Sequence, residues 1–159
     1  MNDDLKTLYG LVRRTRAGVL DWLDSLPSGV LTRERYDFAF GSLDGIYTHI
    51  ADCYLHWVEN VGLGRERRWL EGGSVPALRS AFAIVDEVVV EALALFTDPD
   101  EPIRWTSPEG YEEVLSGRWL IAHPITHEFH HKGQSLALAR VLGFPHPGRP
   151  DTDLVPPFP

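Results

Sequence analysis

Histidines recur at four-residue intervals in residues 123–134, whose sequence is HPITHEFHHKGQ. In an α-helix a step of four residues turns the side chain by only about 40°, so His123, His127 and His131 lie along one face. The same face carries Leu120, Gln134 and Leu138. These neighbours indicate that the face points into the protein, where several imidazoles cannot all be hydrated. A bound metal ion is the simplest way to satisfy them.

A third ligand is predicted to come from a second helix, in which His49, Cys53, His56 and Asn60 follow the same step of three or four residues. His49 together with His127 and His131 would form a three-histidine site with open positions for water or substrate, as catalytic metal ions require. Cys53 is either a fourth, softer ligand or a small core residue. His56 lies about two turns from His49 and reads as a buried or rim histidine that forms hydrogen bonds.

Residues 127–131 also match the zinc-peptidase pattern HExxH, in which the glutamate is the general base. The surrounding sequence disagrees with a peptidase, because Gln134 and Ala137 stand where the extended pattern needs Gly and His, and no Glu follows Glu128. Glu128 itself has two interpretations. It is a base or a partner of the metal ligands, or it is a solvated helix residue.

Four helices are expected to position these residues. Apolar residues spaced by three and four predict helices over residues 3–26, 42–61, 74–96 and 116–142. Ser74 and Ser116 are candidate N-caps, and Gly143 ends the last helix. Residues 98–115 lose the helical period and predict a loop or a small hairpin. The expected fold is an all-α antiparallel four-helix bundle, in one domain over residues 1–159 with a proline-rich tail from residue 144.

Composition and charge narrow the class of protein. The 159 residues carry 15 Lys and Arg against 23 Asp and Glu, a formal net charge of −8. This sign disfavours nucleic acid as a partner. The absence of a long apolar run and of signal-peptide character, with a single cysteine, predicts a soluble cytoplasmic protein that does not enter a membrane. Tryptophan and phenylalanine in the loops are compatible with a homodimer.

The sequence resembles the DinB/YfiT-like superfamily of metal-binding four-helix bundles. The resemblance covers essentially the whole chain. It rests on His49 followed by Trp57, on the string of residues 127–134, and on the sequences LGFP at 142–145 and PDTDL at 150–154. It implies that His49, His127 and His131 bind a divalent metal, with Gln134 as a supporting residue, and that relatives are often dimers. The roles of His56, His123, His130 and Cys53 stay open.

Some members of this superfamily are S-transferases or isomerases that use thiols such as bacillithiol or mycothiol. The resemblance therefore implies an enzyme with Zn or Ni at three histidines, a low-molecular-weight thiol as cofactor, and a small-molecule substrate. Because a divalent cation lowers the pKa of a bound thiol or water, the same site also suits a hydrolase. A metal-binding protein without catalytic activity is the third alternative.

Overall fold

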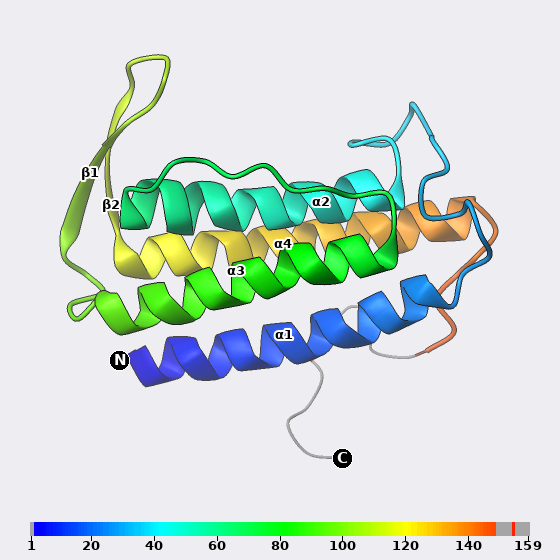
Figure 1. Ribbon diagram of the computed structural model, residues 1–159, viewed down its shortest axis with the longest axis horizontal. Helices are drawn as coiled ribbons and strands as arrows, with labels where there is room; N and C mark the ends of the chain where they lie inside the picture. The colour runs from blue at the N-terminus through cyan, green and yellow to red at the C-terminus, as the bar shows by residue number, and fades with distance from the viewer. Residues whose placement is uncertain (1, 149–153, 155–159) are drawn as a thin grey trace.

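Helices dominate the computed structural model, which describes residues 2–148 and residue 154 (Figure 1). The helices are α1 (Asn2–Asp24), α2 (Leu43–Tyr54), α3 (Val75–Leu95) and α4 (Gly117–Val141), and α2 continues directly into a π-helix, η1 (Leu55–Gly62). The strands β1 (Pro102–Thr106) and β2 (Glu112–Ser116) pair antiparallel as a hairpin between α3 and α4. The prediction of a mostly helical protein is therefore confirmed, and of the two alternatives for residues 98–115, a loop or a small hairpin, the structure has the hairpin.

Serine side chains begin three of the helices. Ser42, Ser74 and Ser116 each accept a hydrogen bond from the backbone N–H three residues later, which satisfies a donor that the helix leaves without a partner. The two caps predicted from the sequence are thus confirmed. At the other end of α4, Gly143 has a φ of 91°, the left-handed conformation that commonly ends a helix at glycine.

The helices do not alternate in direction throughout. α1 lies antiparallel to α3, and α2 lies antiparallel to α4, but α2 and α3 run in the same direction (Figure 1). The prediction of an antiparallel bundle is wrong for this pair. The reason is the long connection over residues 63–74, which can extend over roughly 40 Å. This is more than the length of α3, whose 21 residues span about 31 Å. The chain can therefore return along α2 to its beginning before α3 starts.

The second helix changes its winding at Leu55. The sequence predicts one helix over residues 42–61, but from Leu55 to Gly62 the backbone is a π-helix, in which hydrogen bonds join residues five apart. His56 is the second residue of this π-helix, and its ring contacts the rings of Trp57 and Trp105.

Glycines allow η1, α3 and α4 to meet near the hairpin. A Cβ atom on Gly117 would lie 2.8 Å from the ring of Phe96, and one on Gly62 would lie 3.0 Å from it. Only glycine leaves room for this ring at both positions. The core away from this end is aliphatic and aromatic, with Val12, Leu43, Ile46, Ile50, Leu78, Val85, Val89, Ile121 and Leu138 fully buried.

The segment after α4 returns to α1. Phe144 packs against the core, and the ring of His146 contacts that of Trp22 edge to face, with 4.9 Å between ring centroids. The rest of the predicted proline-rich tail, residues 149–153 and 155–159, lies outside the described residues. Among the helices of the described part of the chain, none is long and apolar enough to cross a membrane.

Candidate metal centre

Three histidines from two helices converge where α2 packs against α4. His49 comes from α2, and His127 and His131 come from successive turns of α4. The Nε2 atom of His127 lies 3.3 Å from that of His49 and 3.1 Å from that of His131. All three ligand atoms lie within 4.8 Å of one another. The structure thus brings together the three residues that the sequence singled out; this group is called the histidine cluster below.

The spacing of these nitrogens suits a metal ion. Zinc binds imidazole nitrogen at 2.0–2.1 Å, and tetrahedral ligands at that distance are about 3.3 Å apart. The two measured separations, 3.1 and 3.3 Å, agree with this value. Neutral imidazoles that offer three lone pairs to one point repel each other unless a cation lies between them. The donor set is therefore chemically suited to a divalent metal.

Gln134 sets the orientation of one ligand. Its Oε1 atom accepts a hydrogen bond from Nδ1 of His131 at 2.7 Å. Because an amide oxygen only accepts, the proton of the neutral ring must lie on Nδ1, and Nε2 is left free to bind a metal. The amide nitrogen of Gln134 donates in turn to Nε2 of His130 at 3.0 Å. Gln134 thus has the supporting position that the resemblance implies.

The surroundings keep the histidine cluster neutral. Burial, followed by the nearby charges of His131 and His49, lowers the pKa of His127 to about 4. The pKa of His49 is also lowered, mainly by burial and then by His131. Burial lowers the pKa of His131 as well, although its hydrogen bond with Gln134 opposes the shift. At neutral pH the rings are therefore unprotonated, as metal ligation requires.

Phe40, which the sequence analysis missed, covers part of the histidine cluster. Its ring stacks on His49 at 3.8 Å between centroids and meets His131 edge to face at 5.2 Å. Phe40 has a φ of 60°, a conformation that a bulky residue rarely adopts. A Cβ atom on Gly45 would overlap the carbonyl oxygen of Phe40, so the glycine admits this loop against α2. The proximity of Phe40 to Gly41 and Gly45 was the available sequence signal.

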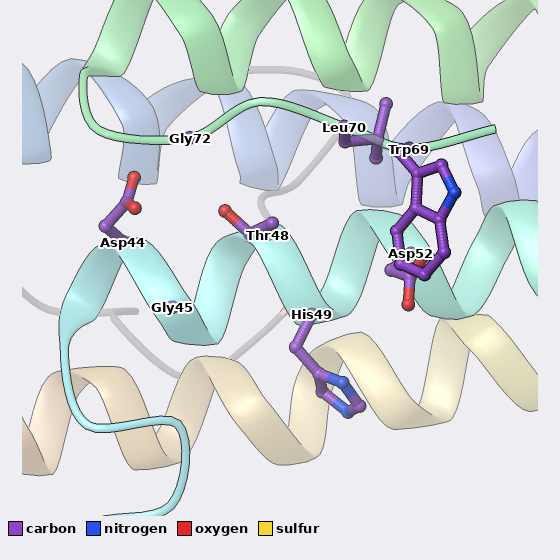
Figure 2. A pocket seen from close by; sticks show the side chains of 8 residues that line it. All are labelled: Asp44, Gly45, Thr48, His49, Asp52, Trp69, Leu70 and Gly72. Atoms are coloured by element: carbon purple, nitrogen blue, oxygen red, sulfur yellow. The ribbon is translucent and has the colours of Figure 1, made fainter.

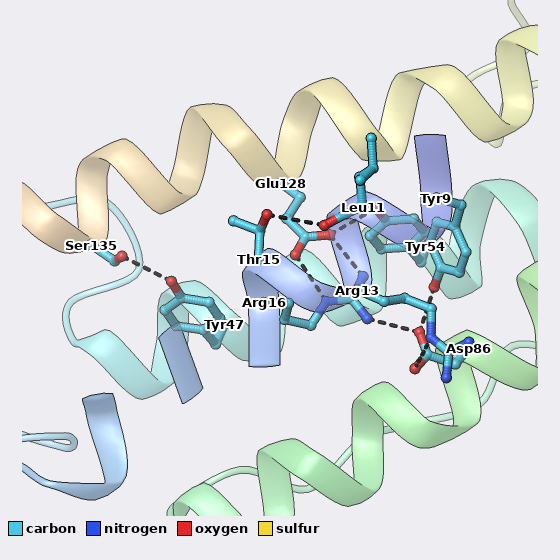
Figure 3. Close-up of polar contacts among 10 residues, drawn as sticks. All are labelled: Tyr9, Leu11, Arg13, Thr15, Arg16, Tyr47, Tyr54, Asp86, Glu128 and Ser135. Carbon is cyan, nitrogen blue, oxygen red and sulfur yellow. Dashed lines mark hydrogen bonds and ion pairs between the residues drawn. The ribbon is translucent and has the colours of Figure 1, made fainter. Parts of the chain in front are cut away.

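Glu128 points from α4 toward Arg16 of α1 and Tyr54 of α2 (Figure 3). Its carboxylate accepts two hydrogen bonds from Arg16 of α1, both at 2.9 Å, and one from the hydroxyl of Tyr54 at 2.7 Å. Glu128 is only 4% exposed, so its interpretation as a solvated residue is wrong. Since both carboxylate oxygens are occupied by Arg16, the arrangement does not supply the general base that the HExxH pattern requires.

The sequence model that describes the DinB family matches residues 1–153. The chain belongs to the DinB family. No curated protein matches it. In this DinB-family chain, the match covers all four helices and every residue of the histidine cluster.

The remaining candidate ligands of this DinB-family protein are not members of the histidine cluster. His123 stacks on Trp119, and His56 contacts Trp57 and Trp105. Cys53 is buried and is not part of the cluster that could hold a metal. Burial, with a smaller effect of Asp52, raises the pKa of its thiol to about 12. Of the two interpretations of Cys53, a softer metal ligand or a small core residue, the structure therefore favours the core residue.

A groove of about 390 Å³ borders the histidine cluster, between α2 and residues 69–72 (Figure 2). Asp44 and Thr48 point from α2 toward this connecting segment, whereas the ring of His49 points toward α4. Asp44 accepts a hydrogen bond from the backbone of Gly73, and Asp52 pairs with Arg67. Asp44 and Asp52 thus hold the connection over residues 63–74 against α2. The candidate metal ligands of this DinB-family chain lie on the opposite side, where the ring of His49 faces α4.

Proposed function

We propose that this DinB-family protein is a metal-dependent S-transferase that joins a low-molecular-weight thiol, of the bacillithiol or mycothiol type, to an electrophilic small molecule. The observation that carries the proposal is the convergence of three Nε2 atoms, 3.1 and 3.3 Å apart, with Gln134 fixing one of the rings. A divalent cation such as Zn²⁺ or Ni²⁺ bound there would lower the pKa of a neighbouring thiol and so favour a thiolate at neutral pH.

The ligand set favours an anionic partner. The rings of His49, His127 and His131 are neutral and contribute no negative charge, and no carboxylate belongs to the cluster among the described residues. A thiolate would supply the missing charge. In the transfer, the thiol proton passes to water, the sulfur forms a bond with the electrophilic carbon, and the leaving group departs with the electron pair of the bond that breaks.

A hydrolase is less well supported by the same geometry. Hydrolysis in an HExxH protein depends on a glutamate that takes a proton from water. Here Glu128 is bound to Arg16 and Tyr54 on another face of the helix. Thiol transfer does not need this base, because a thiol loses its proton far more readily than water.

The proposal is tested by thiol transfer with protein reconstituted with Zn²⁺ or Ni²⁺. Bacillithiol or mycothiol and monochlorobimane are supplied, and the fluorescent thioether is measured. We expect turnover with the wild type and with His146→Ala, whose ring contacts Trp22 outside the cluster, and background rates with His131→Ala. Hydrolysis of test esters without thiol consumption would support the hydrolase instead. Metal binding with neither activity would support a non-catalytic protein.

A further inference from the structure

Five aromatic side chains form a second cluster next to the histidines. The elements that carry them meet at the end of the protein where the hairpin rises (Figure 1). They come from three elements: His56 and Trp57 from η1, Trp105 from β1, and Trp119 and His123 from α4. We call this group the aromatic cluster. Trp57 lies at its centre, with ring centroids 5.2 Å from Trp105, 4.9 Å from Trp119 and 5.4 Å from His123.

The aromatic cluster is continuous with the histidine cluster. The rings of His123 and His127 lie 5.9 Å apart, and His123 is stacked on Trp119 at 4.5 Å with 10° between the planes. A path of ring contacts therefore leads from a candidate metal ligand to Trp119. A molecule held on these rings would have its reactive end within reach of the histidine cluster.

The aromatic cluster is not part of the closed core. Trp57, Trp105 and His123 are half-buried, and Trp119 is 36% exposed. By contrast, the core residues of α2 and α4, such as Ile50 and Leu138, are fully buried. Keeping large aromatic rings partly in water costs free energy that burial would recover. Such rings, gathered from three elements beside a reactive centre, are typical of a ligand-binding surface.

We propose that the aromatic cluster binds a planar aromatic group of the electrophilic substrate, which stacks on Trp119. This inference rests on the proposed function and names the class of its electrophile. Aromatic rings in proteins favour offset-stacked and edge-to-face partners at 4.5–7 Å, and the cluster already uses both arrangements. A further ring would continue the stack of His123 and Trp119, and Trp119 is 36% exposed.

A cationic ligand suits the aromatic cluster less well. Binding of a quaternary ammonium uses aromatic faces that surround an open box. Here Trp57 is in direct contact with Trp105 and Trp119, so the rings fill the space between one another. A divalent ion at the neighbouring histidines would also repel a cation. A neutral aromatic ring meets neither obstacle.

Binding of a matched pair of alcohols to zinc-loaded protein tests the inference. 2-Naphthol is planar, and decahydro-2-naphthol has the same carbon skeleton without aromatic rings. We expect saturation-transfer NMR and calorimetry to detect 2-naphthol and much weaker binding of the saturated alcohol. Loss of one stacking partner in Trp119→Leu should weaken 2-naphthol binding by about two- to tenfold. Trp69→Leu is the control, since Trp69 is 81% exposed and lies outside the aromatic cluster.

Equal binding of both alcohols, or equal losses in Trp119→Leu and Trp69→Leu, would overturn the inference. Kinetics separates this failure from that of the proposed function. If the protein transfers thiol to aliphatic electrophiles as fast as to aromatic ones, the S-transferase proposal holds and the inference of an aromatic substrate is wrong. If 2-naphthol binds selectively but no electrophile accepts thiol, the aromatic-binding site holds and the S-transferase proposal is wrong. If both hold, Trp119→Leu raises KM for the aromatic electrophile with little change in kcat.

Discussion

His127 and Glu128 are neighbours in α4, but their side chains have different partners. The Nε2 atom of His127 lies 3.3 Å from that of His49 on α2, whereas the carboxylate of Glu128 is bound to Arg16 on α1 and to Tyr54 at the end of α2. Consecutive residues of a helix point about 100° apart, so one turn of α4 supplies both a candidate metal ligand and a buried ion pair. The ion pair is therefore one of the buried contacts that hold α4 at the rotation in which His127 faces α2.

Removing one partner of this ion pair should destabilise the protein strongly. In Arg16→Met, Glu128 keeps its buried charge and loses two hydrogen bonds, and Asp86 loses a third. Breaking a buried pair in this way costs about 3–5 kcal/mol. We expect a fall of this size in the free energy of unfolding, measured by urea denaturation.

The double variant Arg16→Met with Glu128→Gln should recover part of the loss, because the buried carboxylate beside the missing guanidinium is then replaced by a neutral amide. Arg118→Ala is the surface control. Its pair with Asp100 is exposed, so water screens the attraction and the loss should be far smaller than in Arg16→Met. Similar losses in Arg16→Met and Arg118→Ala would contradict the stabilising role of the buried pair.

Metal content is expected to depend on both helices of the histidine cluster. Wild-type protein, reconstituted with zinc and freed of excess, should retain about one ion per chain. His49→Ala and His131→Ala should each lose it, because two imidazoles leave the ion poorly held. Elemental analysis is the measurement, and His146→Ala should keep the wild-type content. Retention of zinc by both cluster variants would place the ion elsewhere.

Gln134 is expected to control metal affinity rather than folding. Gln134→Leu removes the acceptor of the 2.7 Å hydrogen bond from Nδ1 of His131, so the ring loses its fixed orientation and tautomer. Changes to such supporting residues typically cost about 10- to 100-fold in affinity. Competition with a chelator measures this loss. His130→Ala removes only the other partner of Gln134 and should have a smaller effect.

Phe40 should reveal backbone strain when glycine and alanine are compared. Both Phe40→Gly and Phe40→Ala remove the ring that stacks on His49, but only glycine adopts a φ of 60° without penalty. We expect Phe40→Gly to be more stable than Phe40→Ala by about 1 kcal/mol in chemical denaturation. Equal stability would mean that the loop relaxes out of this conformation. Both variants should release metal to a chelator faster than the wild type.

Acid should destabilise the metal-free protein over a defined range. The pKa of His127 is about 4 in the folded protein, below the ordinary value of about 6.5 that it regains on unfolding. The unfolded chain therefore binds more protons, and the stabilising contribution, complete above pH 6.5, is lost as pH falls toward 4. The pKa values of four further histidines are also lowered in the folded protein: His49, His56, His123 and His131.

Urea denaturation at a series of pH values measures this dependence. His127→Gln should flatten the curve between pH 6.5 and 4, because the titrating group with the largest shift is gone. An unchanged slope in that variant would assign the acid sensitivity to other groups. Bound zinc should move the loss of stability to lower pH, since the metal competes with protons for the same nitrogens.

The sequence was sufficient for features that depend on local periodicity. The step of four residues from His127 to His131 places both rings on one face of any α-helix, whatever surrounds it. The caps at Ser74 and Ser116 are equally local, because a serine side chain reaches the N–H three residues later. For the same reason the helix bounds agree with the structure to within a few residues.

Features that depend on packing between distant residues were beyond the sequence. The place of Glu128 in the helical period is compatible with exposure to water or with a buried partner. Only the position of α1 brings Arg16, 112 residues away, into contact with it. The π-helical winding of residues 55–62 also has no signal in the spacing of the apolar residues. The aromatic cluster likewise joins residues from η1, β1 and α4 that no spacing rule connects.

The sequence by itself therefore determined the candidate ligands, because helical periodicity is a property of each segment alone. Only the tertiary structure decided which residues complete and border the site. The packing of α2 on α4 brings His49 to His127, and the loop conformation places the ring of Phe40 on that of His49. Arg16 forms an ion pair with Glu128. These outcomes depend on the relative rotation of whole helices. That rotation is set by the sum of buried contacts across the core, which no single segment encodes.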